Sequence, residues 1–350
     1  MNKIFIKNKI ISENSKPFIV AEMSGNHNQS LNLALKIVKA AHDAGADAIK
    51  LQCYTPDSMT LNINKKDFVI NDKNSPWNGM KLYDLYRKAA TPQSWFKKIY
   101  KYSKKLGILC FSSVFDFDGL KFLESIGNPV YKISSFELNH IPLIDAVSKT
   151  KKPIIISTGM GSDEEIKLAV DTCRKNKNNK IILLKCTSEY PTKIENCNLS
   201  QINSYKKKFK CLVGMSDHTD DYIAPIIGVS RGAVLIEKHF KLNDKLKSVD
   251  QSFSLNPESF HKMVLETAKV KKILGSGKNN FSRSENKNSS FKRSIFVNQT
   301  VRKGEVITNK NIKIIRSSKG IHPKNLNLVL GKKFKNNMTK GSPLKRSNFA

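Results

Sequence analysis

Hydrophobic positions between residues 18 and 274 form short continuous runs that alternate with longer stretches of helical spacing. Near-continuous apolar strands are typical of parallel sheets buried on both faces, and a 3.6-residue period between them predicts helices. The pattern therefore predicts eight strand-then-helix units and a (β/α)8 barrel of the α/β class, with a doubly wound open sheet as the alternative. The expected strands cover residues 18–22, 47–52, 108–113, 130–135, 153–157, 181–186, 213–218 and 234–239.

The periodic pattern ends at Leu274. Residues 275–290 are rich in Gly, Ser and Asn, which is the composition of a linker. Residues 291–350 contain two short β-type runs around the turn at 303–305, and a module this small usually needs support from another surface. The chain is therefore divided into a barrel domain at 1–274, a linker at 275–290 and a small, mostly β domain at 291–350.

Two of the expected strands end in histidine, at His218 and His239. Parallel strands joined by one helix end at the same edge of a sheet, so these imidazoles can lie side by side. A pair of imidazoles suits a divalent transition metal and leaves positions for water and substrate oxygens. The alternative is that both are ordinary histidines at strand ends.

Lys50 and Lys132 interrupt strands that are otherwise apolar. A buried ammonium group is costly without an anionic partner, and catalytic groups of such barrels lie at the carboxyl ends of the strands. A bound phosphate or carboxylate would supply that partner. The alternative is an ion pair with Glu22, Glu137 or Glu237.

The net charge of +32 allows nucleic-acid binding, an anionic substrate or simply a solvated, lysine-rich surface. The third is favoured, because Lys is scattered through helices and loops and no nucleic-acid-binding motif accompanies it. The six cysteines form no CxxC pair, and no stretch has the length of a membrane span. We therefore expect a cytoplasmic protein with neither a membrane nor a nucleic-acid partner.

The connection at 54–91 is longer than an ordinary strand-to-helix loop and carries an aromatic cluster at 77–86. This cluster could form one wall of a sugar pocket or a small hydrophobic lid without ligand contact. Both interpretations stay open at this point.

Several segments resemble the sialic acid synthase family in order and spacing, and the resemblance covers nearly the whole chain. They are residues 21–28, 44–52, 131–135, 156–160, 185–191, 216–219 and 237–240. Residues 303–305 and 316–323 resemble the family's C-terminal antifreeze-like (SAF) domain. Within the family, residues 21–24 and 77–86, followed by Thr91 and Pro92, are most similar to the pseudaminic acid synthase branch, with the N-acetylneuraminate and legionaminate branches as alternatives.

The resemblance implies a transferase that condenses phosphoenolpyruvate with an aldehyde amino sugar, giving a nine-carbon 2-keto acid and phosphate with cleavage of a C–O bond. For the pseudaminic branch the sugar is 2,4-diacetamido-2,4,6-trideoxy-β-L-altropyranose in its open-chain form. The resemblance also implies Mn²⁺ or Mg²⁺, with Co²⁺ as a substitute, bound by His218 and His239. It further implies a homodimer in which each C-terminal domain caps the active site of its partner.

The same resemblance assigns residue roles. The expected catalytic residues are Glu22, Glu137, His218 and His239. The expected phosphoenolpyruvate ligands are Lys50, Ser113, Lys132, Ser135, Ser157, Thr187 and Ser216. The expected sugar contacts are Tyr190, Asp250, Phe291 and Arg316, the last reaching from the partner's C-terminal domain. Lys185 is expected as a further cation at the barrel mouth, where it deepens the anion site or merely reflects the lysine-rich composition.

Overall fold

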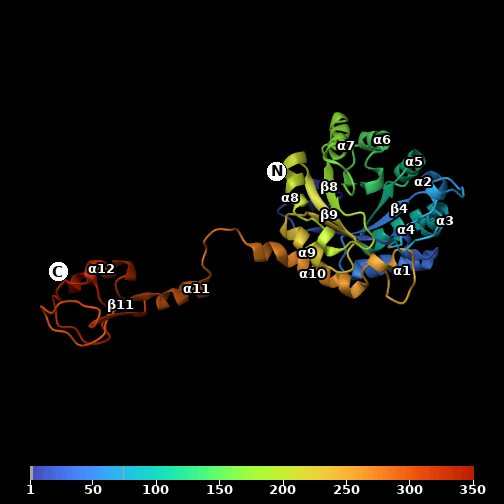
Figure 1. Ribbon diagram of the computed structural model, residues 1–350. Coiled ribbons are helices and arrows are strands. Elements are labelled where there is room, and N and C mark those ends of the chain that lie inside the picture. Colours follow the sequence, from blue (N-terminus) through green and yellow to red (C-terminus); the bar gives the residue numbers. More distant parts are fainter. Residues whose placement is uncertain (1–2, 74) are drawn as a thin grey trace. The chain divides into compact units, whose positions relative to one another are not determined.

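The structure is a computed structural model that describes residues 3–73 and 75–350 (Figure 1). The chain forms two compact units, one ending at Gly275 and the other covering Ser276–Ala350. Each unit is described by itself. Among the described residues, no helix combines the length and the apolar character that crossing a membrane requires.

The first unit is a closed barrel of parallel strands in the order β10-β3-β4-β5-β6-β7-β8-β9. Closure comes from β10 pairing with β3, from Leu235 opposite Phe18 to His239 opposite Glu22. The predicted (β/α)8 barrel is confirmed, and the open-sheet alternative is wrong because no strand edge remains at this junction. The strands are β3 (Phe18–Glu22), β4 (Ala48–Cys53), β5 (Leu109–Val114), β6 (Tyr131–Ile133), β7 (Ile154–Ser157), β8 (Ile181–Cys186), β9 (Leu212–Asp217) and β10 (Leu235–His239).

Helices follow the strands and surround the barrel (Figure 1). Local sequence fixes where they begin; α7, for example, has a capping box in which Ser162 and Glu165 satisfy each other's backbone N–H groups. The surrounding helices are α1 (Leu31–Asp43), α4 (Gln93–Leu106), α5 (Phe117–Ser125), α6 (Ile141–Lys149), α7 (Asp163–Lys175), α8 (Gln201–Phe209), α9 (Ile223–Ser230) and α10 (Pro257–Leu274). The long connection after β4 contains α2 (Pro56–Met59) and α3 (Leu82–Ala89), and a hairpin of β1 (Ile4–Ile6) and β2 (Lys9–Ile11) precedes the barrel.

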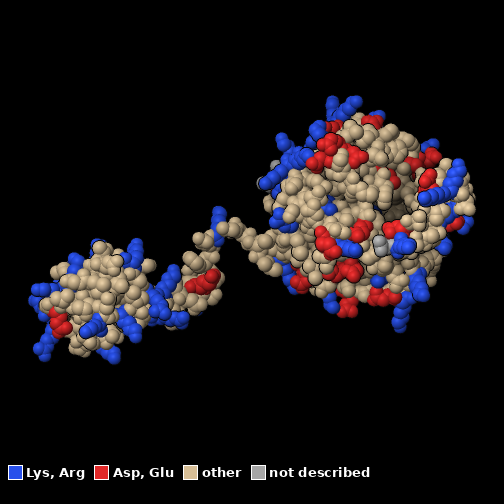
Figure 2. Space-filling view, viewed as in Figure 1, with Lys and Arg blue, Asp and Glu red and all other residues tan. Residues whose placement is uncertain are grey.

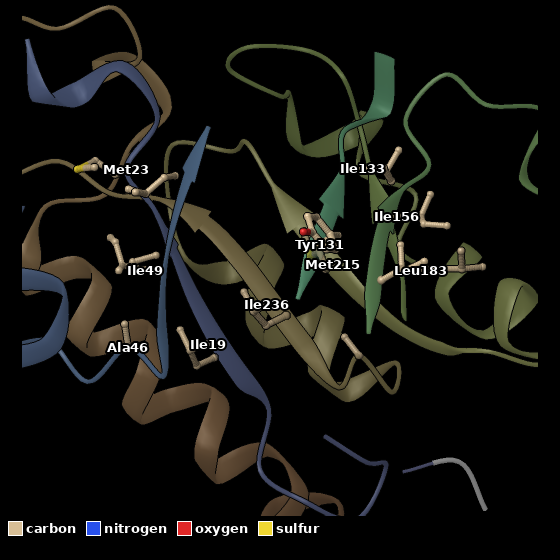
Figure 3. Close-up of a cluster of buried hydrophobic side chains, with 14 of the residues drawn as sticks. Ile19, Met23, Ala46, Ile49, Tyr131, Ile133, Ile156, Leu183, Met215 and Ile236 are labelled. Carbon is tan, nitrogen blue, oxygen red and sulfur yellow. The ribbon is translucent and has the colours of Figure 1, made fainter. Parts of the chain in front are cut away.

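Side chains of the strands alternate between two hydrophobic cores. One core lies inside the barrel and contains Val20, Ala48 and Leu184. The other lies between strands and helices, and Figure 3 shows part of it, including Ile19 and Leu183. Because successive side chains point to opposite faces, this alternation decides which polar residues face the barrel axis at the strand ends.

The second unit contains the antiparallel pair β11 (Arg293–Val297) and β12 (Ile312–Arg316), with short helices α11 (Arg283–Asn288) and α12 (Leu326–Val329). The expected mostly β character is confirmed. A hydrophobic cluster that includes Ile295, Phe334 and Leu344 gives it a small core of its own. Residues 276–290, expected to be a linker, group with this unit and include α11.

Candidate active site at the barrel mouth

The barrel mouth, meaning the edge formed by the carboxyl ends of the strands, brings the two expected metal ligands together. The ring centroids of His218 and His239 are 5.3 Å apart. His218 Nδ1 lies 2.9 Å from the Thr187 carbonyl oxygen, to which it can donate its proton, leaving the Nε2 lone pair available. Burial holds the pKa of His239 well below its ordinary value, so this ring is neutral.

These features fit a divalent ion. The buried Nδ1 of His239 has no hydrogen-bond partner among the described residues, and a neutral imidazole is the ligand form that metals require. Nowhere in the described chain do three or more His, Cys, Asp or Glu side chains gather as a metal cage. The two imidazoles would therefore supply two ligands and leave the others to water and substrate.

A buried charge cluster lies on the inner faces of β3, β4, β6 and β10. Lys50 Nζ is 2.8 Å from Glu22 Oε2 and 3.3 Å from Glu237 Oε1. Lys132 Nζ is 3.9 Å from the same Glu237 oxygen and donates to the carbonyl of Ile133 at 3.2 Å. In this structure Lys50 therefore has carboxylate partners, as the alternative interpretation proposed, whereas Lys132 has only the longer contact.

Burial shapes the ionisation of this cluster. It lowers the pKa of Lys132, with the attraction of Glu237 only partly opposing it. Burial also raises the pKa of Glu22 to about 7 against the opposing charge of Lys50. Lys132 is therefore the cation that a bound anion would stabilise most, and Glu22 can exchange a proton near neutral pH.

Glu137 adds a second carboxyl group of this kind. It ends the short 3₁₀ turn Ser135–Glu137 after β6, and burial raises its pKa to about 7. Its Oε2 is buried and has no hydrogen-bond partner among the described residues. Such an atom is available to a substrate hydroxyl, a water molecule or an aldehyde oxygen.

Hydroxyl groups complete the polar lining. Ser113 Oγ accepts from Lys50 Nζ at 3.2 Å, and Ser216 Oγ donates to Glu237 Oε1 at 3.1 Å. Ser135 Oγ accepts from the N–H of Gly159 at 3.2 Å. The Oγ atoms of Ser157 and of Ser188, a residue that the sequence reading did not select, are buried without partners in the described structure.

Gly159 permits the close approach of two of these hydroxyls. A Cβ at this position would lie 2.3 Å from Ser188 Oγ and 2.8 Å from Ser135 Oγ. Buried hydroxyls without a partner are costly, so an oxygen-rich ligand that completes the hydrogen bonds of Ser157 and Ser188 best explains these two side chains.

Aromatic rings form a wall beside the histidines. Tyr190 lies 4.4 Å from His218 and 5.1 Å from Phe253, and Trp77 lies 5.6 Å from Tyr190, all between ring centroids. Trp77 Nε1 donates to the carbonyl of Val249 at 2.7 Å, which attaches the 54–91 connection to the segment after β10. Trp77 thus belongs to the wall. Phe253 was missed because it ends a short 3₁₀ turn, Gln251–Phe253, whose sequence has no distinguishing pattern.

Some expected residues are placed differently. Asp250 uses Oδ2 to accept hydrogen bonds from Ser24 Oγ and from Gly25 N–H, the latter at 3.0 Å, so it also holds the segment after β3. Thr187 Oγ1 accepts a hydrogen bond from Lys185 Nζ at 3.0 Å and donates one to the Asn196 carbonyl oxygen at 3.1 Å.

Lys185 is not a cation of the mouth. Strand alternation places it on the outer side of β8 with Leu183, where it donates to the Cys186 carbonyl at 2.9 Å. The expectation for Lys185 is therefore wrong. Cys186, which points inward instead, lies between Ser135 Oγ at 3.5 Å and His218 Nδ1 at 3.9 Å. Phe291 and Arg316 belong to the second unit, where both are exposed.

Comparison with known proteins places this architecture in a family. Residues 37–279 match the NeuB family, and residues 292–350 match the SAF domain. The chain belongs to the NeuB family. It is 44% identical to the pseudaminic acid synthase of Campylobacter jejuni subsp. jejuni (strain 81-176), over 95% of this chain and 97% of that protein.

Two further proteins are similar to this chain. The N,N'-diacetyllegionaminic acid synthase of Legionella pneumophila subsp. pneumophila is 31% identical, with 93% of each chain covered. The crystal structure of the N-acetylneuraminic acid synthetase from Leptospira borgpetersenii serovar Hardjo-bovis in complex with citrate is 33% identical, with a TM-score of 0.74 over 83% of this chain and 96% of that one.

Proposed function

We propose that this chain condenses phosphoenolpyruvate with the open-chain aldehyde of 2,4-diacetamido-2,4,6-trideoxy-β-L-altropyranose, releasing pseudaminic acid and phosphate. The observation that carries the proposal is the 44% identity with a pseudaminic acid synthase over nearly the full length of both proteins. The buried cations, carboxyl groups and unpartnered hydroxyls at one barrel mouth supply the chemistry that this reaction needs.

Phosphoenolpyruvate is the anion that the lysine and serine cluster would bind. Lys132 and Lys50 lie on neighbouring parts of the inner wall, joined through Glu237. The hydroxyls of Ser113, Ser135 and Ser157 can donate to phosphate and carboxylate oxygens. Preorganised donors in a water-excluded site act more strongly than the same groups in water.

Two bonds form in the reaction. The C3 carbon of phosphoenolpyruvate attacks the aldehyde carbon, whose oxygen takes up a proton and becomes a hydroxyl group. Water adds to the oxocarbenium carbon C2 and loses one proton. The C2–O bond to phosphate then breaks, and the C2 hydroxyl gives its remaining proton to the departing phosphate, which leaves the ketone. Glu22 and Glu137, each with a pKa raised by burial to about 7, are our candidates for delivering and accepting these protons.

His218 and His239 would hold Mn²⁺ or Mg²⁺, with Co²⁺ as a substitute. When bound there, the ion supplies Lewis-acid polarisation of the aldehyde oxygen. The aromatic wall of Trp77, Tyr190 and Phe253 would bind the apolar parts of the sugar, namely its acetamido methyl groups and the C6 methyl group. The six free cysteines are all buried, in keeping with a reducing compartment, and we place the enzyme in the cytoplasm.

We also propose a homodimer in which the C-terminal unit of one protomer caps the barrel mouth of the other and delivers Arg316 and Phe291. Large apolar side chains are exposed in the connections after β4 to β9 or at the first residue of the helix that follows, and such side chains mark an interaction surface where they form a contiguous patch. These residues are Leu61, Phe117, Phe136, Met160, Ile194 and Ile223. Lys and Arg, in contrast, are spread over the visible surface of both units, as expected of a solvated charge (Figure 2).

Phosphate release from phosphoenolpyruvate, measured with a panel of aldehyde sugars, tests the function. We expect turnover with the altrose derivative, loss of turnover with EDTA and recovery with Mn²⁺. Preference for N-acetylmannosamine or for the legionaminate precursor would keep the reaction and replace the sugar, which is the second candidate supported by the legionaminate relative. Absence of phosphate release with every sugar would contradict the proposed reaction.

A further inference from the structure

A fully buried ion pair lies behind the two histidines, on the outer faces of β9 and β10. Asp217 and Lys238 are directly opposite each other in the β9–β10 ladder, with Lys238 Nζ 2.6 Å from Asp217 Oδ2. Both side chains are buried, Lys238 completely. Because strand side chains alternate, the pair faces the helices while the next residues, His218 and His239, face the mouth.

Thr219 closes this pair into a network. Its N–H donates to Asp217 Oδ1 at 3.2 Å and its Oγ1 donates to Asp217 Oδ2 at 2.9 Å. Lys238 Nζ also donates to the Thr219 carbonyl oxygen. The Asp217 carboxylate therefore joins the residues on both sides of His218. Lys238, which directly precedes His239, connects this network to β10.

The network lies where the β9–β10 ladder ends, one residue before His218, whereas His239 is still paired with Glu22 of β3. The paired residues of β9 and β10 end with Asp217 opposite Lys238, and β9 itself ends at Asp217. His218 follows this last pair, so the ladder hydrogen bonds do not set its position. Beyond the ladder, the His218 carbonyl oxygen accepts from Thr192 N–H at 2.9 Å and its ring contacts the Thr187 carbonyl oxygen, while the side-chain network joins the residues on either side of it.

Stability alone is a poor explanation for this pair. Removing two charges from water costs several kcal/mol per ion, and well-packed apolar residues are often at least as stabilising. A closed hydrogen-bond network fixes the geometry of its members, which an apolar pair cannot do, because hydrogen bonds form only within a narrow range of distances and angles.

We propose that Asp217 and Lys238 are positioning residues that hold the backbone of His218 and His239 at the separation at which both imidazoles bind one divalent ion. This inference rests on the proposed function, since it assumes that the two histidines bind a metal. It assigns Asp217 and Lys238 no contact with substrate.

The test is metal binding by the full-length, substrate-free protein carrying Asp217→Asn together with Lys238→Met. Both replacements remove charge while keeping side-chain size, so no buried charge is left unpaired. The matched control is Asp47→Asn with Lys9→Met, which removes an ion pair of 3.1 Å that attaches β2 to the residue preceding β4, at the opposite end of the barrel. Mn²⁺ affinity is measured by electron paramagnetic resonance, and the Co²⁺ absorption spectrum reports ligand geometry.

We expect the Asp217/Lys238 variant to lose about tenfold to a hundredfold in Mn²⁺ affinity, the range typical of lost second-layer contacts to metal ligands, and to change the Co²⁺ spectrum. The control should bind Mn²⁺ as the parent does. Equal affinity in the Asp217/Lys238 variant and the parent would overturn the inference, as would an equal loss in both variants, because a general loss of stability would then explain it. If the parent itself binds neither ion, the proposed metal site fails and the inference fails with it.

A second variant keeps the test decisive if the double variant does not fold. Thr219→Val preserves the shape of the side chain and removes the hydrogen bonds of its hydroxyl group, which donates to Asp217 Oδ2 and to the Asp221 carbonyl and accepts from Lys238 Nζ. A weakened Mn²⁺ affinity in this folded variant supports the inference, and parental affinity contradicts it.

Discussion

Lys50 Nζ lies 2.8 Å from Glu22 Oε2, yet burial still raises the pKa of this carboxyl group to about 7. An ion pair of this length in water would lower a carboxyl pKa instead. The difference arises because Glu22 is fully buried and Glu237, which shares Lys50, adds a second negative charge. Glu22 is thus held near the lysine that would bind phosphoenolpyruvate while remaining able to exchange a proton at neutral pH.

Glu22→Gln tests this role. If Glu22 accepts a proton during turnover, the parent activity rises with pH through about 7, because only the ionised form accepts protons. We expect the variant to lose this rise and to have a kcat lower by about 10²–10⁴, with a small change in KM for phosphoenolpyruvate. Glu266→Gln, on the exposed face of α10, is the control and should leave the pH profile unchanged. A variant that retains the parental pH profile would exclude Glu22 as the base.

Glu137→Gln tests how much the ionisation of the second buried carboxyl group destabilises the folded protein. The folded-state pKa of about 7 lies above the ordinary value of 4.5, so the folded protein binds this proton more tightly than the unfolded chain. Stability contributed by the protonated group is therefore present below about pH 4.5 and is lost as pH rises to about 7. Glutamine never ionises, so the variant should gain up to about 3 kcal/mol over the parent at pH 8 and little at pH 4.5.

Unfolding in urea at pH 4.5, 6, 7 and 8 measures this difference for Glu137→Gln. A gain that is independent of pH would mean that packing, not ionisation, distinguishes the variant from the parent. Activity measured on the same samples should fall, since the amide cannot transfer the proton that the carboxyl group transfers.

Trp77→Ala tests the aromatic wall. Trp77 contacts Tyr190 and Phe253 and donates a hydrogen bond of 2.7 Å to the Val249 carbonyl. We expect kcat/KM for the sugar to fall by about 10–100-fold, equivalent to about 1.4–2.8 kcal/mol, while KM for phosphoenolpyruvate stays close to that of the parent. Trp77→Phe keeps the ring and loses only the hydrogen bond, so it should retain most of the activity. An equal loss for both substrates would show that Trp77 supports the fold of the loop and does not contact the sugar.

The sequence predicted the residues whose position depends on strand alternation. Lys50, Lys132 and His239 sit inside strands with clear hydrophobic patterns, so their common edge followed from parallel topology. The same alternation could have shown that Lys185 faces outward, since Leu184 and Cys186 are its inward neighbours. The local hydrophobic pattern was thus sufficient to predict the charged cluster, and it also contained the information needed to avoid the error at Lys185.

Contacts made by loops could not be predicted in this way. Phe253 meets His239 at 4.8 Å between ring centroids only because the segment after β10 folds back over the mouth. Ser188 Oγ, which has no partner among the described residues, lies close to the backbone of Gly159, distant in sequence, because a glycine has no Cβ to exclude it. Both facts depend on tertiary packing between connections, which no periodic pattern encodes.

The proposed capping by the partner subunit can be tested by mixing two inactive proteins. His239→Ala removes a candidate metal ligand from the barrel, and Arg316→Ala removes the cation proposed to reach the sugar from the C-terminal unit. If Arg316 acts in the barrel of its partner, a mixed dimer contains one complete site, because the Arg316→Ala barrel receives Arg316 from the His239→Ala chain. Random exchange should then restore about a quarter of the parental activity, since half of the dimers are mixed and each has one complete site of two.

If Arg316 acts within its own chain, each protomer of the mixed dimer remains defective, and mixing restores nothing. Subunit exchange is followed separately with two affinity tags, so that absent activity is interpreted only when mixed dimers have formed. Sedimentation of the separate variants should show dimers for both, because neither substitution removes the exposed apolar side chains of the connections after β4 to β9. Monomers at micromolar concentration would contradict the proposed assembly, since capping in trans requires a second copy of the chain.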